Sequence, residues 1–253
     1  MGREREDRPS LEQLVESENL GVEILHPGGL EITRELAELC HIGKGANVLD
    51  VASGTGESAC YVTEQFECQM VGIDVSEYMI HRARQKAQER HLSMEFKQGD
   101  AHHLPFDDHA FDAVISECTM CLLNKDRAIG EMVRVTRPGG YVGMHDVCWK
   151  EGTPERLKQA LVEKEGERPE TLQGWKSLFE KAKLTDIRTV DKSELIPAWI
   201  EGIKKRLGVI GQVKIFLKVI KKWGIDGYKS IRESEQIFQS EHTGYGIIVG
   251  RKP

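Results

Sequence analysis

Val48-Leu-Asp-Val-Ala-Ser-Gly-Thr-Gly-Glu57 begins as an apolar run, stops at an acid and then breaks into a glycine turn. Short apolar runs bounded by turn residues are typical of buried strands, so we expect a strand over residues 46–51. Ser53, Gly54 and Gly56 would form the turn, and a helix would start near Glu57. Because glycine has no side chain, a ligand can lie directly against this backbone.

The glycine turn alone leaves two interpretations open. Gly54-Thr-Gly-Glu-Ser-Ala59 fits a permissive dinucleotide-binding fingerprint, and Asp74 follows where a ribose-binding acid is expected. An ionised Asp74 can accept hydrogen bonds from both ribose hydroxyls. The alternative is a tight connection between strand and helix that binds nothing.

The segments that follow favour a ligand. We expect further strands over residues 70–74, 94–100, 111–116 and 141–147, and each delivers a polar group at its carboxyl end. Helical patterns near 57–67, 77–91 and 124–136 separate most of them. Such alternation predicts a doubly wound α/β sheet with parallel strands and right-handed crossovers, which binds ligands at the carboxyl ends of its strands.

Four motifs in order carry a family resemblance, over about residues 25–150. They are VLDVASGTG, VGIDVS, GDAHHLPFDDHAFDAV and RVTRPGGYVGMHDV. Together they resemble class I S-adenosylmethionine-dependent methyltransferases of the small-molecule type, which includes quinone, phosphoethanolamine and arsenite methylating enzymes. The resemblance implies a Rossmann-like, seven-stranded, mostly parallel sheet. Residues 185–190 and 244–251 would be its last two strands, with the last antiparallel and beside the fifth.

The resemblance also implies which residues hold the cofactor, S-adenosylmethionine. Val75 and Met79 would border the adenine, and Asp100 and Ala101 would contact its amino edge. A strand-end turn cap is the alternative role for Asp100. The turn residues Ser53, Gly54 and Gly56 would face the methionine part, while Asp50 would brace the turn through hydrogen bonds.

The acceptor end of the site is predicted after the fourth and fifth strands. Glu117 and Cys118 stand where family members approach the methyl group, and Glu117 is assigned to both cofactor and catalysis. His145 and Asp146, at the end of the predicted fifth strand, are the nearest candidates for a general base if the acceptor is a hydroxyl. His26 either faces the site or is an ordinary loop histidine.

Cys118-Thr-Met-Cys121 is a C-x-x-C motif with several possible uses. It could bind a soft metalloid, as in arsenite methyltransferases, form a redox pair, or pack as small apolar residues. Without a second cysteine pair, structural zinc is not expected, and no residue is assigned to a metal. No cysteine follows Cys148, although the arsenite enzymes need one in their C-terminal half.

Composition limits the partners and the compartment. The 253 residues carry a net charge of −6, so we expect no nucleic-acid partner. The charged N-terminus and the lack of a membrane-length apolar run predict a cytoplasmic protein with free thiols. We divide the chain into a helical lid segment (1–45), a cofactor-binding core (46–194), a helical insertion that covers the acceptor (195–240) and the last strand (241–253).

The insertion is a basic amphipathic helix. Leu207, Ile210, Val213, Leu217 and Ile220 recur at helical spacing. Its basic residues are Lys204, Lys205, Arg206, Lys214, Lys218, Lys221 and Lys222. Either this helix is a lid with its lysines in water, or it makes weak contact with an anionic membrane surface. Both roles favour an apolar acceptor over a highly charged metabolite.

The sequence therefore predicts an S-adenosylmethionine-dependent methyltransferase that acts on a small, apolar molecule by in-line displacement. Three alternatives stay open: a metalloid or thiol methyltransferase that uses Cys118, an NAD-dependent oxidoreductase, and a non-catalytic cofactor-binding protein.

Overall fold

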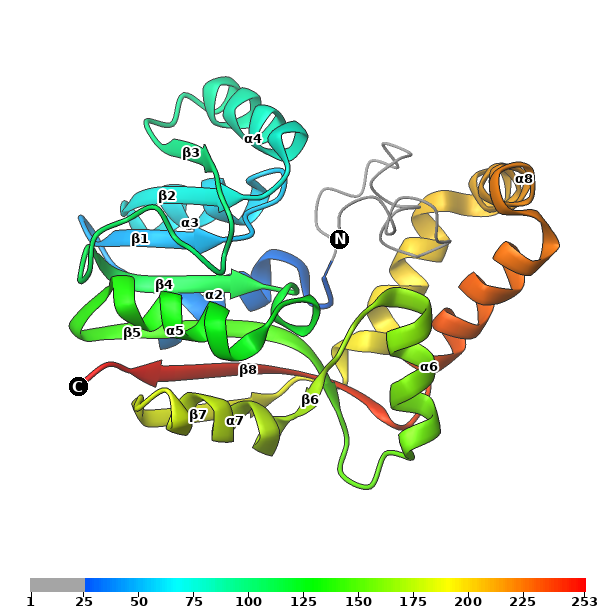
Figure 1. Cartoon of the computed structure of the whole chain (residues 1–253). Coiled ribbons are helices and arrows are strands. Elements are labelled where there is room, and N and C mark those ends of the chain that lie inside the picture. Colours follow the sequence, from blue (N-terminus) through cyan, green and yellow to red (C-terminus); the bar gives the residue numbers. More distant parts are fainter. Residues whose placement is uncertain (1–25) are drawn as a thin grey trace.

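The computed structural model describes residues 26–253, so most of the predicted N-terminal lid segment lies outside the described residues. One sheet runs through the centre of the molecule, with helices on both faces (Figure 1). The strands are β1 (Asn47–Val51), β2 (Gln69–Asp74), β3 (Glu95–Gln98), β4 (Phe111–Glu117), β5 (Thr136–Trp149), β6 (Glu170–Thr171), β7 (Thr185–Asp191) and β8 (Thr243–Arg251).

The helices alternate with the strands along most of the chain, as the sequence pattern predicts. They are α2 (Gly29–Leu39), α3 (Glu57–Phe66), α4 (Glu77–Glu89), the 3-10 turn η1 (Met120–Leu122), α5 (Lys125–Val135), α6 (Glu155–Glu165), α7 (Leu172–Lys181) and α8 (Leu195–Phe238).

The strand order is β3-β2-β1-β4-β5-β8-β7, and β6 pairs with β5 outside this path. Strands β1 to β5 pair in parallel, whereas β8 runs antiparallel to both of its neighbours, β5 and β7. The predicted doubly wound fold and the antiparallel last strand beside the fifth are therefore confirmed.

Two apolar cores lie on opposite faces of the sheet because side chains alternate along each strand. In β1, Val48 belongs to the core with α2, α3 and α4, which also contains Phe96. Leu49 and Val51 belong to the core with α5 and α7, which contains the fully buried Trp175. Both faces of β1 are therefore covered, and every residue of this strand after Asn47 is buried.

The larger differences from the sequence prediction concern the third strand, the fifth strand and the number of strands. The third strand ends at Gln98 rather than at residue 100, because the chain already turns at Gly99 and Asp100. The fifth strand extends over Thr136–Trp149 instead of 141–147. The sheet has eight strands instead of seven, because the two-residue β6 pairs with Cys148 and Trp149. Two residues are too few to show a strand periodicity.

A buried ion pair joins the first turn of α3 to α4. The carboxylate of Glu57 accepts bonds from Lys86 Nζ at 2.5 Å and from the guanidinium of Arg90. Burial would raise the pKa of Glu57, but these two cations outweigh it and hold that pKa below its usual range. The pair fixes the helix that follows the glycine turn.

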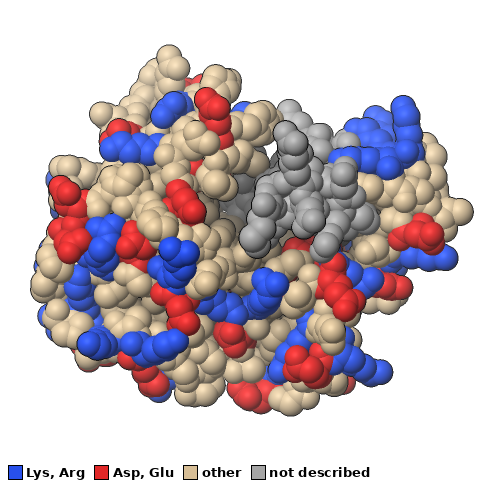
Figure 2. All heavy atoms as spheres, viewed as in Figure 1, with Lys and Arg blue, Asp and Glu red and all other residues tan. Residues whose placement is uncertain are grey.

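The predicted insertion forms α8, which bends at Gly208 and Gly224, where the backbone leaves helical geometry. Its second half is anchored to α6, where Leu161, Ile237 and Trp149 pack together. Much of the predicted apolar stripe is exposed, including Ile210 at 73%. Lysine side chains gather over this part of the molecule, at the upper right of Figure 2. Within residues 26–253, no helix has the length and apolarity that a membrane span requires.

Candidate active site

The glycine turn and the acid at the end of β2 meet as the spacing predicts. Asp74 accepts a hydrogen bond from Gly54 N at 3.0 Å and another from Ser76 N at 2.8 Å. Gly54 and Gly56 both have positive φ, and the space around them differs. A Cβ on Gly54 would meet nothing within 4 Å, whereas one on Gly56 would lie 2.7 Å from Phe96. Gly54 thus leaves room for a ligand, and Gly56 allows the helix to pack closely on the sheet.

Two further predicted site residues lie at this turn and in the strand before it, Ser53 and Asp50. Ser53 N donates to Ile73 O at 3.0 Å, while its buried Oγ has no hydrogen-bond partner among the described residues. Asp50 is buried, and burial together with Glu117 and Asp74 raises its pKa well above the usual range. Asp50 thus lies beneath the turn rather than at its open side.

The predicted adenine flank has an apolar and a polar side. Val75 is 72% exposed directly after Asp74, and Met79 is half-buried in the first turn of α4. Asp100 accepts a hydrogen bond from His102 N at 2.8 Å, which lowers its pKa, and also contacts His102 Nδ1 at 2.7 Å. The turn-cap role of Asp100 is therefore present, and the adenine contact of Asp100 and Ala101 stays a prediction.

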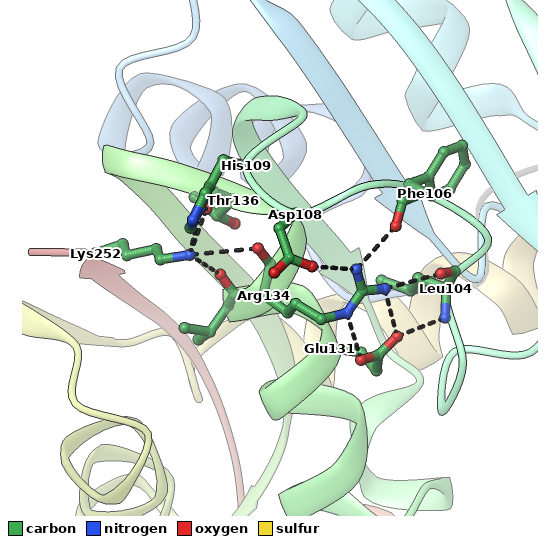
Figure 3. A network of polar contacts seen from close by, with 9 residues as sticks. Leu104, Phe106, Asp108, His109, Glu131, Arg134, Thr136 and Lys252 are labelled. Carbon is green, nitrogen blue, oxygen red and sulfur yellow. Dashed lines mark hydrogen bonds and ion pairs between the residues drawn. The ribbon is translucent and has the colours of Figure 1, made fainter.

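An arginine holds the loop that follows Asp100 (Figure 3). Arg134 of α5 donates to Leu104 O at 2.9 Å and to Phe106 O at 2.8 Å. Its guanidinium also pairs with Glu131 and Asp108. This network fixes the loop backbone, and sequence reasoning gave it no role.

The acceptor end contains a buried polar cluster around Glu117. His26 Nε2 lies 3.0 Å from Glu117 Oε2, and His145 Nε2 lies 3.4 Å from Oε1. Ser58 Oγ and Thr33 Oγ1 donate to Oε2 at 2.6 and 3.2 Å. Burial would raise the pKa of Glu117, but the two histidines outweigh it and hold this pKa well below its usual range. His26 is therefore not an ordinary loop histidine.

His145 and Cys118 are joined through a tyrosine that the sequence analysis did not select. Tyr245 Oη lies 2.5 Å from His145 Nδ1 and 2.9 Å from Cys118 Sγ. Burial, followed by the nearby Asp146, raises the pKa of Cys118 well above its usual range. Its thiol stays protonated at neutral pH, unlike the thiolate of a reactive cysteine.

Asp146 has a structural role beside this cluster. Its carboxylate accepts hydrogen bonds from Cys121 N at 2.9 Å and Val147 N at 2.7 Å. Burial raises its pKa to about 6. Because both oxygens already hold backbone N–H groups, Asp146 fixes the turn that carries Cys121.

The surface also has a hollow of about 410 Å³ elsewhere, lined by residues such as His41, Ala46 and Tyr141. It lies at the edge of the sheet where β1 begins, because Ala46 directly precedes that strand. Open α/β sheets bind ligands at the opposite edge, so we assign the site to the Asp74 and Glu117 region.

The chain is similar to several known proteins. Residues 49–144 match the family described as "Methyltransferase domain". Phosphoethanolamine N-methyltransferase 1 of Arabidopsis thaliana is 27% identical over 231 residues, which cover 89% of this chain and 46% of that protein. The chain thus spans about half the length of this plant relative.

Two solved structures show the same fold. The [4+2]-cyclase SpnF has a TM-score of 0.78 at 24% identity, with 97% of each chain covered. Phosphoethanolamine N-methyltransferase 2 of Haemonchus contortus, solved with S-adenosyl-L-methionine, has a TM-score of 0.75 at 18% identity over 91% of this chain and 54% of its own. Residues 49–144 are therefore similar to a methyltransferase domain, and the chain as a whole shares the fold of these two solved structures.

Proposed function

We propose that the protein transfers the methyl group of S-adenosylmethionine to a small, apolar acceptor bound beside Glu117. The observation that carries this proposal is the arrangement of two different polar sites along one edge of the sheet. Gly54 and Asp74 lie at the ends of β1 and β2, and the cluster is built around Glu117, the last residue of β4, and its register partner His145 on β5.

The first site suits the cofactor. The ribose would bond to Asp74, the adenine would lie along Val75, and the methionine part would pass over Gly54 toward the unpartnered Ser53 Oγ. The sulfonium already activates the methyl group, so the protein mainly has to hold donor and acceptor in line.

The second site suits an acceptor that loses a proton. Glu117, His145 and Tyr245 lie next to one another in the buried cluster, and each is a group that can hold a proton. The contacts of Glu117 come from imidazoles and hydroxyls. A phosphate ester such as the acceptor in the plant relative's name would instead call for arginine or lysine. A neutral hydroxyl compound is therefore favoured.

Cys118 is better suited to positioning than to nucleophilic or metalloid chemistry. Its sulfur contacts Tyr245, and its raised pKa disfavours the thiolate that a soft ligand would need. This favours an oxygen, nitrogen or carbon acceptor over a metalloid or thiol.

Calorimetry with S-adenosylmethionine, S-adenosylhomocysteine and NAD tests the cofactor class, and we expect binding of the first two only. Incubation with methyl-labelled cofactor and a cell extract then tests transfer, with Asp74→Ala as the inactive control. Tight cofactor binding without any labelled product would instead favour a cofactor-binding protein without transferase activity.

A further inference from the structure

In the cluster around Glu117, the side-chain atoms that face one another lack hydrogen-bond partners among the described residues. His26 Nε2, Glu117 Oε1 and His145 Nε2 are buried, and none of them has a well-directed hydrogen bond to the described residues. Their side chains are 7%, 7% and 0% exposed. Buried polar atoms without partners cost about 1–3 kcal/mol each, so three that face one another indicate a missing partner.

The two imidazoles are oriented by contacts on their outer sides. Pro27 O, which can only accept, lies 3.4 Å from His26 Nδ1 and makes this nitrogen the protonated one. Tyr245 Oη holds His145 Nδ1 at 2.5 Å. With Nδ1 directed toward Pro27 O, Nε2 is the nitrogen of His26 that faces the carboxylate of Glu117, 3.0 Å away. A cation bound between these two atoms could be coordinated by both.

The dimensions of the cluster suit a metal ion. One nitrogen from each histidine and one oxygen from Glu117 lie within 4.8 Å of one another. Bonds of 2.0–2.1 Å in a tetrahedral arrangement would place such atoms about 3.3 Å apart. The separations from Glu117 are 3.0 and 3.4 Å, so small side-chain shifts would complete the site. Ser58 and Thr33 already hold the carboxylate, as outer contacts do in metal sites.

We propose that His26, Glu117 and His145 bind a divalent transition-metal ion of the Zn²⁺ type. Two histidines and one carboxylate form a ligand set of catalytic zinc sites, which keep the fourth position open for an exogenous donor.

The role of the ion rests on the proposed function, although its binding does not. The open position would take the hydroxyl oxygen of the acceptor and lower the pKa of that hydroxyl, so that its proton is lost to water. The acceptor atom then bonds to the methyl carbon. The electron pair of the breaking C–S bond stays on the cofactor sulfur, which becomes a neutral thioether.

The test uses the full chain without an affinity tag, freed of metal by a chelator. Calorimetry with Zn²⁺ and the visible absorption of added Co²⁺ should show one ion bound per chain. His26→Gln and His145→Gln should each weaken binding more than about 100-fold. Tyr245→Phe, which removes only an outer contact, should weaken it about 10- to 100-fold. His81→Gln, on the exposed face of α4, is the matched control and should bind as the wild type does.

Two results would overturn the metal site. One is the absence of saturable Zn²⁺ or Co²⁺ binding by a protein that still binds S-adenosylhomocysteine, which leaves the proposed function intact. The other is binding that survives His26→Gln and His145→Gln but is lost in Cys118→Ser. Conversely, a protein that binds the ion but no S-adenosylhomocysteine would retain the metal site and refute the proposed function. Circular dichroism of each variant confirms that it is folded.

Discussion

Replacing Asp74 with alanine should weaken S-adenosylhomocysteine binding while leaving the fold intact. The carboxylate holds Gly54 N at 3.0 Å and Ser76 N at 2.8 Å, so it is already positioned before the ligand arrives. Two ribose hydroxyls would add two charge-assisted bonds. Their loss should cost about 2–4 kcal/mol, which is roughly 30-fold to several hundredfold in Kd by calorimetry.

The same carboxylate predicts how binding depends on pH. Burial raises the pKa of Asp74 in the free protein, and its backbone bonds only partly offset this. Ribose hydroxyls bond best to the ionised form, so affinity should be full above that pKa and fall as the pH decreases through it. Asp74→Asn, which does not titrate, should bind weakly with little of this dependence.

The matched control is Glu151→Ala, which removes an exposed carboxylate from the turn after β5. It should bind S-adenosylhomocysteine as the wild type does. An unchanged Kd for Asp74→Ala would refute the reasoning, because it would remove Asp74 from the site and with it the alignment of the four motifs.

Three further predictions test other parts of the molecule. Cys118→Ser should retain methyl transfer within several-fold, because a hydroxyl can replace the protonated thiol; loss of turnover with intact cofactor binding would restore the thiol or metalloid hypothesis. Glu57→Gln should lower the unfolding free energy by about 2 kcal/mol at neutral pH. Because the folded pKa of Glu57 is depressed, its stabilisation is present above its unfolded pKa and is lost as the pH falls, so urea unfolding of Glu57→Gln should be less acid-sensitive than that of the wild type. The wild-type protein should sediment weakly with anionic vesicles, in a salt-sensitive way, through Lys214, Lys218 and Lys221. Changing all three lysines to Glu should abolish this sedimentation. A wild-type protein that stays in the supernatant at low salt would leave α8 as a lid only.

The strands of the sheet could be predicted because short stretches of sequence mark most of them. Strands β2 and β4 are short, mostly apolar segments that end at Asp74 and Glu117, and Val48 to Val51 shows the pattern of a strand buried on both faces. What the sequence could not show was β6, whose two residues pair with β5 only because the intervening α6 brings them there. Tertiary contacts, not propensity, create that strand.

The cofactor half of the site was also predictable, since one glycine turn and one acid 20 residues later carry it. The acceptor half was predictable only in part. Glu117 and His145 follow from their positions at strand ends, and they are register partners on neighbouring strands. Ser58 and Thr33 lie in helices where nothing in the local sequence distinguishes them from solvent-facing residues.

Tyr245 is the most instructive omission. Ligand-binding residues were sought at the carboxyl ends of strands, yet Tyr245 stands near the amino end of β8, which begins at Thr243. Because β8 is antiparallel to β5, its first residues lie at the same edge as the last residues of β5, and Tyr245 pairs in register with Val147. The last strand is expected to be antiparallel. Its ligand-binding residues are therefore expected at its amino end, not at its carboxyl end. Applied in this form, the rule about strand ends would have brought Tyr245 to His145 and Cys118 from sequence and topology alone.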